Sequence, residues 1–233
     1  MRLISISTLL LLATLAAAPV SSKEPLQPIL ARMDKGASEF KTMTAHVTYV
    51  THTDVLNDDS RETGTIAMQK VGPNEVKSLI EFLTPDKRTV QFEKRLLRIY
   101  YPKMKTIQEW DLSKHGEQLD QFFMIGFGRS GTALAKDYDM TVVGTETLKN
   151  AQGAQTIRLR LIPKLGEAHE YVKQLELWIP QTGDPYPLQE KISLPSGDYR
   201  LAIFNDLKTN TPLPPGALQL KHPDGVKTEH PGK

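Results

Sequence analysis

The sequence predicts a mainly β protein with a few helices: an unclosed antiparallel β-barrel of about eleven strands, with an N-terminal helix and a central helical lid over an apolar cavity. Three observations predict this fold. Apolar residues recur every three or four positions over 25–40. From residue 44 onward they alternate with polar residues at period two, and the alternation stops only between 113 and 138.

The composition of the 233-residue chain excludes several classes of protein. The chain has no cysteine, so disulfides, thiolate metal sites and a cysteine nucleophile are ruled out. Its formal net charge of +2 lacks the strong basic excess of a general nucleic-acid binder. We therefore expect a globular protein that binds no nucleic acid.

Residues 1–22 have the pattern of a cleaved signal peptide. Arg2 provides a positive start, and residues 3–18 are almost entirely apolar and end in three alanines. Pro19 and the polar residues after it cut this run short of the roughly 20 residues that a membrane span needs. We expect the remainder, 23–233, to be one domain in the periplasm, and without a cysteine it would carry no lipid anchor of its own.

The first expected element after the signal peptide is a helix over 25–40 with one apolar face. Gly36 lies inside this helix, where glycine costs about 1 kcal/mol relative to alanine. We therefore expect packing against the rest of the protein to hold the helix.

The period-two region is expected to form a meander of antiparallel strands. Clusters of glycine, proline, asparagine and aspartate separate its segments as turns. The expected strands start at Thr44 and cover 64–68, 76–83, 89–93, 96–101, 106–112, 140–144, 156–162, 171–179, 188–194 and 199–204. A polar tail is expected from about residue 222.

The interruption between 113 and 138 is expected to contain two helical segments, 116–125 and 132–136. Between them the chain spells Gly-Phe-Gly-Arg-Ser-Gly over 126–131. A dinucleotide-binding loop of this spacing follows a strand, and this one does not. We interpret the glycines as the end of one helix and Ser130 as the N-cap of the next.

The apolar cavity is inferred because one face of the expected sheet has more apolar surface than the few short helices can cover. Many strands are apolar on one side only, and a barrel of more than about eight strands leaves interior space that side chains alone do not fill. The alternative for most of these residues is an ordinary core packed under the helices. The expected cavity residues are Val47, Tyr49, Ile66, Met68, Ile80, Phe82, Val90, Phe92, Ile99, Trp110, Ile157, Leu159, Leu175, Leu177 and Ile203, and the expected lid residues are Leu119, Phe122, Phe123, Ile125 and Phe127.

No catalytic constellation is found in the sequence. The stretch 128–132 departs from the nucleophile-elbow pattern G-x-S-x-G at its last position, Thr132. The six histidines are scattered along the chain and do not fall at metal-ligand spacings. We expect no enzyme activity, no metal and no cofactor.

Basic residues are concentrated between Lys87 and Lys105, where seven of them face the single acidic residue Glu93. Two interpretations remain open. The run forms an outward face whose counter-charges lie elsewhere, or it forms a patch for an anionic headgroup or a membrane surface.

Several segments together resemble the LolA family of outer-membrane lipoprotein carriers, including its sorting-protein branch. The resemblance is carried by the helix ending at 38–42 and by the strand 176–179, which is followed by Asp-Pro-Tyr-Pro at 184–187. It is also carried by the Tyr-Pro-Leu-Gln-Glu-Lys strand at 186–191 and by the C-terminal stretch from Phe-Asn-Asp at 204–206 to Pro-Asp-Gly-Val at 223–226. They span nearly all of the chain after the signal peptide.

The resemblance implies a half-barrel whose apolar interior carries the acyl chains of a lipoprotein or lipid across the periplasm towards the outer membrane. The expected protein is a monomer that makes transient contacts with membrane release and acceptor proteins. An arginine holds the lid shut in this family, so Arg61, Arg129, Arg95 and Arg98 are candidates for a lid latch or a headgroup contact. The alternative function is an envelope-stress sensor or scaffold that uses the same half-barrel to recognise a protein or lipid partner.

Overall fold

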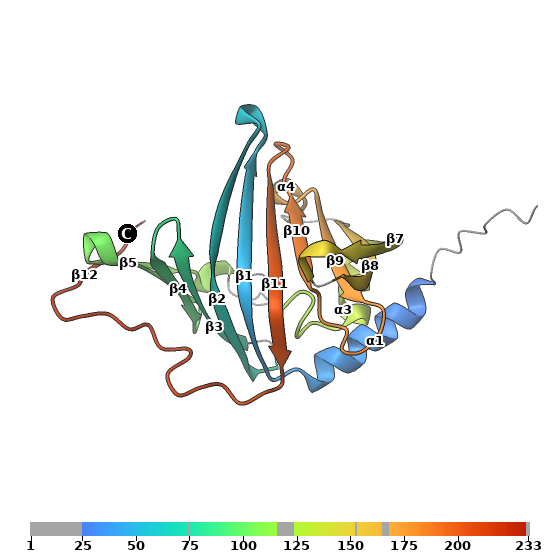
Figure 1. Cartoon of the computed structure of the whole chain (residues 1–233), viewed down its shortest axis with the longest axis horizontal. Coiled ribbons are helices and arrows are strands. Elements are labelled where there is room, and N and C mark those ends of the chain that lie inside the picture. The colour runs from blue at the N-terminus through green and yellow to red at the C-terminus, as the bar shows by residue number, and fades with distance from the viewer. Residues whose placement is uncertain (1–24, 74, 116–123, 152, 165–167, 232–233) are drawn as a thin grey trace, which may run out of the picture.

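The structure, a computed structural model, describes residues 25–73, 75–115, 124–151, 153–164 and 168–231. Within these ranges, one 12-stranded sheet has the order β12-β6-β5-β4-β3-β2-β1-β11-β10-β9-β8-β7 (Figure 1). The strands are β1 (Thr42–Thr53), β2 (Asp58–Gly72), β3 (Glu75–Thr84), β4 (Arg88–Glu93), β5 (Leu96–Tyr101), β6 (Thr106–Asp111), β7 (Tyr138–Leu148), β8 (Ala154–Pro163), β9 (Gln174–Pro180), β10 (Gln189–Ser193), β11 (Tyr199–Thr209) and β12 (Lys227–Glu229). Since β12 and β7 form the two edges of this sheet and do not pair with each other, the predicted unclosed barrel is confirmed, and we call the sheet the half-barrel.

The described helices are α1 (Leu26–Glu39), α3 (Gly131–Asp137) and the single turn α4 (Ala168–Tyr171). The predicted N-terminal helix is confirmed, and the cost of Gly36 is explained by its packing. A Cβ on Gly36 would lie 2.7 Å from the Pro185 ring, and its carbonyl accepts a hydrogen bond of 3.0 Å from the Tyr186 hydroxyl. Glycine is therefore required where α1 meets the loop before β10.

Helix α3 begins as the sequence predicts. The hydroxyl of Ser130, the N-cap residue, accepts a hydrogen bond of 3.1 Å from the backbone N–H of Ala133. The predicted strand start at Tyr171 is wrong, because α4 ends at that residue and β9 begins at Gln174. The expected signal peptide and most of the expected helix 116–125 lie outside the described residues.

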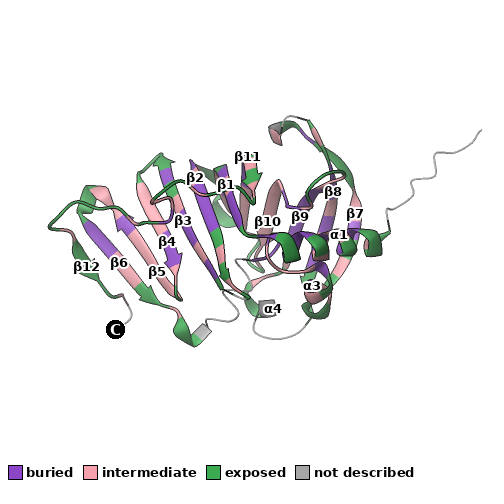
Figure 2. Cartoon of the chain, turned by 90° about the horizontal axis from the view of Figure 1, so that it is seen from below, coloured by how far each residue is buried: buried purple, intermediate pink, exposed green. Residues whose placement is uncertain are grey.

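The sheet has an inner face, on which α1 and α3 pack, and an opposite outer face (Figure 2). Two apolar clusters lie on the inner face. The first joins α1 and α3 to β7, β8 and β9, and the second joins Phe40, Met124, Phe127 and Tyr186 to β1–β4 and β11. The core of the protein therefore lies on one side of the sheet.

The outer face is crossed by residues 212–229, which we call the C-terminal strap (Figure 1). Leu218 of the strap packs with Ala67 and Leu79, and its carbonyl accepts a hydrogen bond of 2.8 Å from the Gln91 side chain. The strap ends in β12, which pairs in parallel with β6. The region after residue 222 is polar and mostly exposed, and within it the structure has a short strand that the sequence did not predict.

Candidate functional site

Register and packing place the predicted cavity residues on the inner face, with one exception. Ile203 pairs with Thr48 of β1, whereas its neighbour Phe204 pairs with Val47 and belongs to the second inner cluster. Ile203 therefore lies on the outer face, and Phe204 is the inner residue that sequence reasoning missed. Both sides of the strand 199–204 carry apolar residues, so alternation could not assign its face.

The inner face of β7–β10 lies under α1 and α3, and we call it the covered half. Leu159, Leu161 and Leu177 have 0% exposure, packed against α1 and α3. Ile157 and Leu175 are buried in the same cluster. The ordinary-core alternative holds for these predicted cavity residues, because helices fill the space above them.

The inner face of β3–β6 is covered less completely, and we call it the open half. Ile80, Val90, Leu97 and Ile99 are only half-buried, and Trp110 keeps 37% of its surface exposed. The register places them side by side across the strands, with Ile80 opposite Val90, Val90 opposite Ile99 and Leu97 opposite Trp110. The open half is therefore a continuous, partly exposed apolar surface.

A polar group closes one end of this surface. Arg88 of β4 forms a two-pronged ion pair with Glu62 of β2, in which Nη2 donates to Oε2 at 2.9 Å. The guanidinium lies 4.1 Å from the centre of the Phe82 ring, and that ring contacts Tyr49 edge-on at 6.3 Å. The hydrogen bonds that Arg88 donates to Glu62 raise the pKa of Arg88, and burial raises the pKa of Tyr49.

Sequence reasoning did not single out Arg88 or Glu62 as site residues. Arg88 belongs to the basic run, and it shares strand parity with the predicted cavity residues Val90 and Phe92. That parity was the signal that could have placed it on the inner face. The structure pairs it with a carboxylate, so the inner end of the basic run is neutralised rather than free.

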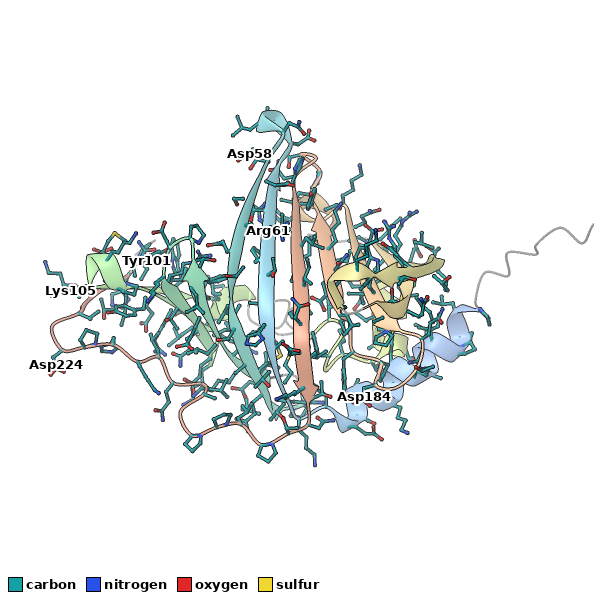
Figure 3. The ribbon with its side chains drawn as sticks, viewed as in Figure 1. Asp58, Arg61, Tyr101, Lys105, Asp184 and Asp224 are labelled. Carbon is teal, nitrogen blue, oxygen red and sulfur yellow. The ribbon has the colours of Figure 1, made fainter. Side chains whose placement is uncertain are left out.

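None of the four candidate arginines lies on the open half. Arg61 is exposed on the β1–β2 hairpin, opposite Val50 (Figure 3). Arg98 lies on the outer face, where it donates to Glu109 at 2.7 Å, and Arg95 lies in the turn between β4 and β5. Arg129 forms an ion pair with Asp137 at the end of α3.

The described part of the predicted lid begins at Met124 and packs onto the inner face. Ile125 enters the first cluster and Phe127 the second, where its ring contacts those of Phe40 and Tyr186. Leu119, Phe122 and Phe123 lie outside the described residues. Residues 124–130, which we call the covering segment, therefore lie over the seam between the two clusters.

Glycines allow this covering segment to pack closely. A Cβ on Gly126 would lie 2.6 Å from the Pro187 ring, and Gly126 has φ +80°. A Cβ on Gly131 would lie 2.9 Å from the Leu30 backbone of α1. These contacts support the prediction that the glycines of the G-x-G-x-x-G stretch are structural.

Side chains fasten the covering segment and α3 to α1. The Asp34 carboxylate accepts hydrogen bonds from the Thr132 backbone N–H at 2.8 Å and from the Thr132 hydroxyl at 2.6 Å. These bonds satisfy an N–H of the first turn of α3, which has no partner within the helix. Polar contacts that hold the helical cover thus exist, but a carboxylate of α1 makes them rather than any of the predicted arginines.

Glu190 of β10 is an unexpected group on the inner face. It pairs in register with Leu177, a member of the first cluster, and with Ala202, which packs against the second cluster. Its Oε1 is shut off from solvent and finds no hydrogen-bond partner in the described part of the chain, and burial raises the pKa of Glu190 to about 8. A neutral carboxylic acid therefore lies beside the apolar seam at neutral pH.

Among the described residues, metal-ligating and titratable side chains do not gather on the open half beyond the Arg88–Glu62 pair at its end. Nowhere in the described ranges do three or more histidine, aspartate or glutamate side chains gather as a metal site would require. His46 pairs with Asp206, and His52 with Asp59, far from the open half on the other face of β1. No helix in the described part of the chain is both long and apolar enough to span a bilayer.

No protein-family model and no curated protein matches the chain. Solved structures do match. An uncharacterized conserved protein from Thermus thermophilus is 16% identical with a TM-score of 0.50, covering 88% of this chain and 98% of its own. The MucA/MucB complex of Pseudomonas aeruginosa gives 16% identity and a TM-score of 0.49, covering 84% of this chain and 61% of the matched one.

A LolA superfamily protein from Nitrosomonas europaea gives 14% identity and a TM-score of 0.37, covering 84% of this chain and 97% of its own. The present chain spans less than two thirds of the matched chain in the MucA/MucB complex. At these identities the likeness concerns the fold alone. The fold that the sequence resemblance implies, an open half-barrel with helices on its inner face, is the one observed.

Proposed function

We propose that this protein binds the acyl chains of a lipid or lipoprotein on the open half of its inner face and carries them through the periplasm towards the outer membrane. The observation that carries the proposal is the unequal covering of the inner face. Helices bury most apolar inner side chains of β7–β9, whereas Ile80, Val90, Leu97 and Ile99 of β3–β5 stay half-exposed. A contiguous apolar surface of this kind marks a site for an apolar partner.

The chemistry of the open half fits a hydrocarbon chain. Its members Ile80, Val90 and Ile99 are aliphatic, and Trp110 adds a broad ring at the edge. Each CH₂ group that leaves water is stabilised by about 0.8 kcal/mol, so a chain of about 16 carbons gains on the order of 12 kcal/mol when sheltered.

The covered half provides the stable core that lets the open half remain partly exposed. The first cluster supplies a filled core, so the sheet does not depend on closing the open half for its stability. A carrier must also release its cargo, and a surface that is only partly enclosed serves release better than a sealed cavity. No reaction is required of the protein in this scheme.

The test is uptake of a fluorescent fatty acid, 11-(dansylamino)undecanoic acid, by the purified protein. We expect saturable fluorescence enhancement, competed by palmitate. Ile99→Asp, which places a carboxylate in the open half, should weaken uptake at least tenfold because the charge must be desolvated. Leu83→Asp, on an exposed residue of neighbouring β3, is the matched control and should leave uptake unchanged.

Mass spectrometry of the gently purified protein completes the test. We expect co-purified acyl lipids, which would also identify the cargo class. A folded protein that carries no lipid and takes up no fatty acid would contradict the proposal and favour the scaffold alternative.

A further inference from the structure

Two glutamates on adjacent strands have opposite environments. Glu176 of β9 lies on the outer face with 2% exposure, and its Oε1 accepts hydrogen bonds of 2.9 and 2.6 Å from Arg158. Glu190 of β10 lies on the inner face, and its buried Oε1 has no hydrogen-bond partner among the described residues. The first glutamate is satisfied within the fold, and the second is not.

The surroundings of Glu190 are apolar. Its register partners are Leu177 on β9 and Ala202 on β11, and Ile192 follows it on the same face of β10. Leu177 belongs to the first cluster, and Ala202 packs against the second. The carboxyl group therefore lies where the covered half meets the rest of the inner face.

The covering segment lies directly above this carboxyl group. A Cβ on Gly126 would be 2.7 Å from Oε1 of Glu190, so only a glycine allows the chain to pass so close. The turn at Gly126 therefore packs against Oε1, and a ligand that reaches this oxygen has to displace the turn.

An unpartnered buried oxygen destabilises a fold, and a leucine at this position would avoid that cost. A neutral carboxylic acid donates one hydrogen bond through its O–H and accepts others. Within an acyl lipid, the matching group is the carbonyl oxygen of the ester or amide at the head of the chain. Hydrocarbon alone offers no such partner.

We propose that Glu190 recognises the ester or amide carbonyl at the head of a bound acyl chain. The inference rests on the proposed function, because it assumes that acyl chains reach the inner face. Glu190 selects acylated molecules over plain hydrocarbon, and the apolar side chains around it hold the first carbons of the chain. The bound carbonyl oxygen accepts a hydrogen bond from the neutral carboxylic acid of Glu190.

The test compares two lysolipids that differ only at this carbonyl: 1-palmitoyl-sn-glycero-3-phosphocholine and its ether analogue 1-O-hexadecyl-sn-glycero-3-phosphocholine. Binding is measured by displacement of the dansyl fatty acid below the lysolipids' critical micelle concentrations. We expect the wild type to bind the ester about fivefold more tightly than the ether, the effect of one net hydrogen bond. Glu190→Leu should bind both equally, and Glu190→Gln should keep the preference.

Glu81→Gln, an exposed glutamate of β3, serves as the control and should behave as wild type. A wild type that binds ester and ether equally overturns this inference and leaves the proposed function standing. A Glu190→Leu variant that keeps the preference also overturns it. A wild type that binds neither lysolipid nor fatty acid overturns both proposals.

Discussion

The covered half and the open half of the inner face are built from the same sheet and the same alternation of apolar and polar residues, yet they differ in what lies above them. Leu159 on β8 is fully buried under α1 and α3, whereas Ile99 on β5 is only half-buried. The covered half behaves as a core and the open half as a surface. The comparison shows that the position of the helices, and not the apolar pattern of the strands, decides which apolar side chains stay accessible to a partner.

The largest expected difference between the halves concerns stability. Leu159→Ala leaves a cavity beneath packed helices and should lower the free energy of unfolding by about 2–5 kcal/mol. Ile99→Ala removes a half-exposed side chain and should cost about 1 kcal/mol or less, since its surroundings are already partly hydrated. Urea denaturation of the two variants measures both. Equal losses would show that the open half is as tightly packed as the covered one.

The second prediction concerns Glu190 at the boundary of the covered half. Its pKa is about 8 in the folded protein against an ordinary value of 4.5, so between these values unfolding releases a proton and stability falls as pH rises. Relative to Glu190→Gln, the wild type should lose up to about 1.4 kcal/mol per pH unit between pH 5 and 8. Below the ordinary pKa the difference should be constant, and above about pH 8 it should level off.

Urea denaturation midpoints of the wild type and Glu190→Gln, measured at several pH values, check this prediction. Glu81→Gln controls for the loss of a carboxylate on an exposed position. Stability curves of wild type and Glu190→Gln that run parallel from pH 5 to 8 would show that Glu190 ionises normally in the folded protein.

The third prediction concerns the fastening of the cover. Asp34→Ala removes both hydrogen bonds to Thr132 and should destabilise the docking of α3 by about 1–2 kcal/mol. Amide hydrogen exchange in Gly131–Asp137 should accelerate about fivefold or more, while exchange in β8 and β9 stays near wild type. Asp58→Ala, at the exposed β1–β2 hairpin, is the control. Unchanged exchange in α3 would show that apolar packing alone holds the cover.

The sequence predicts the architecture well because period-two alternation and turn residues are local signals. The N-terminal helix, the open meander and the Ser130 cap all follow from them. The strand at the end of the C-terminal strap was missed for a physical reason. The strap contains the prolines of Pro212–Pro215 and polar residues after 222, and its few apolar residues, such as Leu218, are spaced too irregularly to predict a strand.

The candidate site is less predictable because covering is a long-range property. Alternation places Leu159 and Ile99 on the same face, but only the folded positions of α1 and α3 decide which is sealed. Ile203 was assigned to the wrong face because its strand is apolar on both sides. Glu190 could have been noticed, since it shares strand parity with Ile192 and interrupts an otherwise apolar face.

The central claim, that the open half receives the acyl chain, is tested most directly by photo-crosslinking with a diazirine-bearing palmitate. Proteolysis and mass spectrometry then map the adducts, and the basic residues between Lys87 and Lys105 give short peptides there. We predict that the adducts fall mainly on β3–β6, at residues such as Val90, Ile99 and Trp110, and that excess palmitate abolishes them. Adducts confined to the outer face or the C-terminal strap, or labelling that excess palmitate does not reduce, would contradict the account.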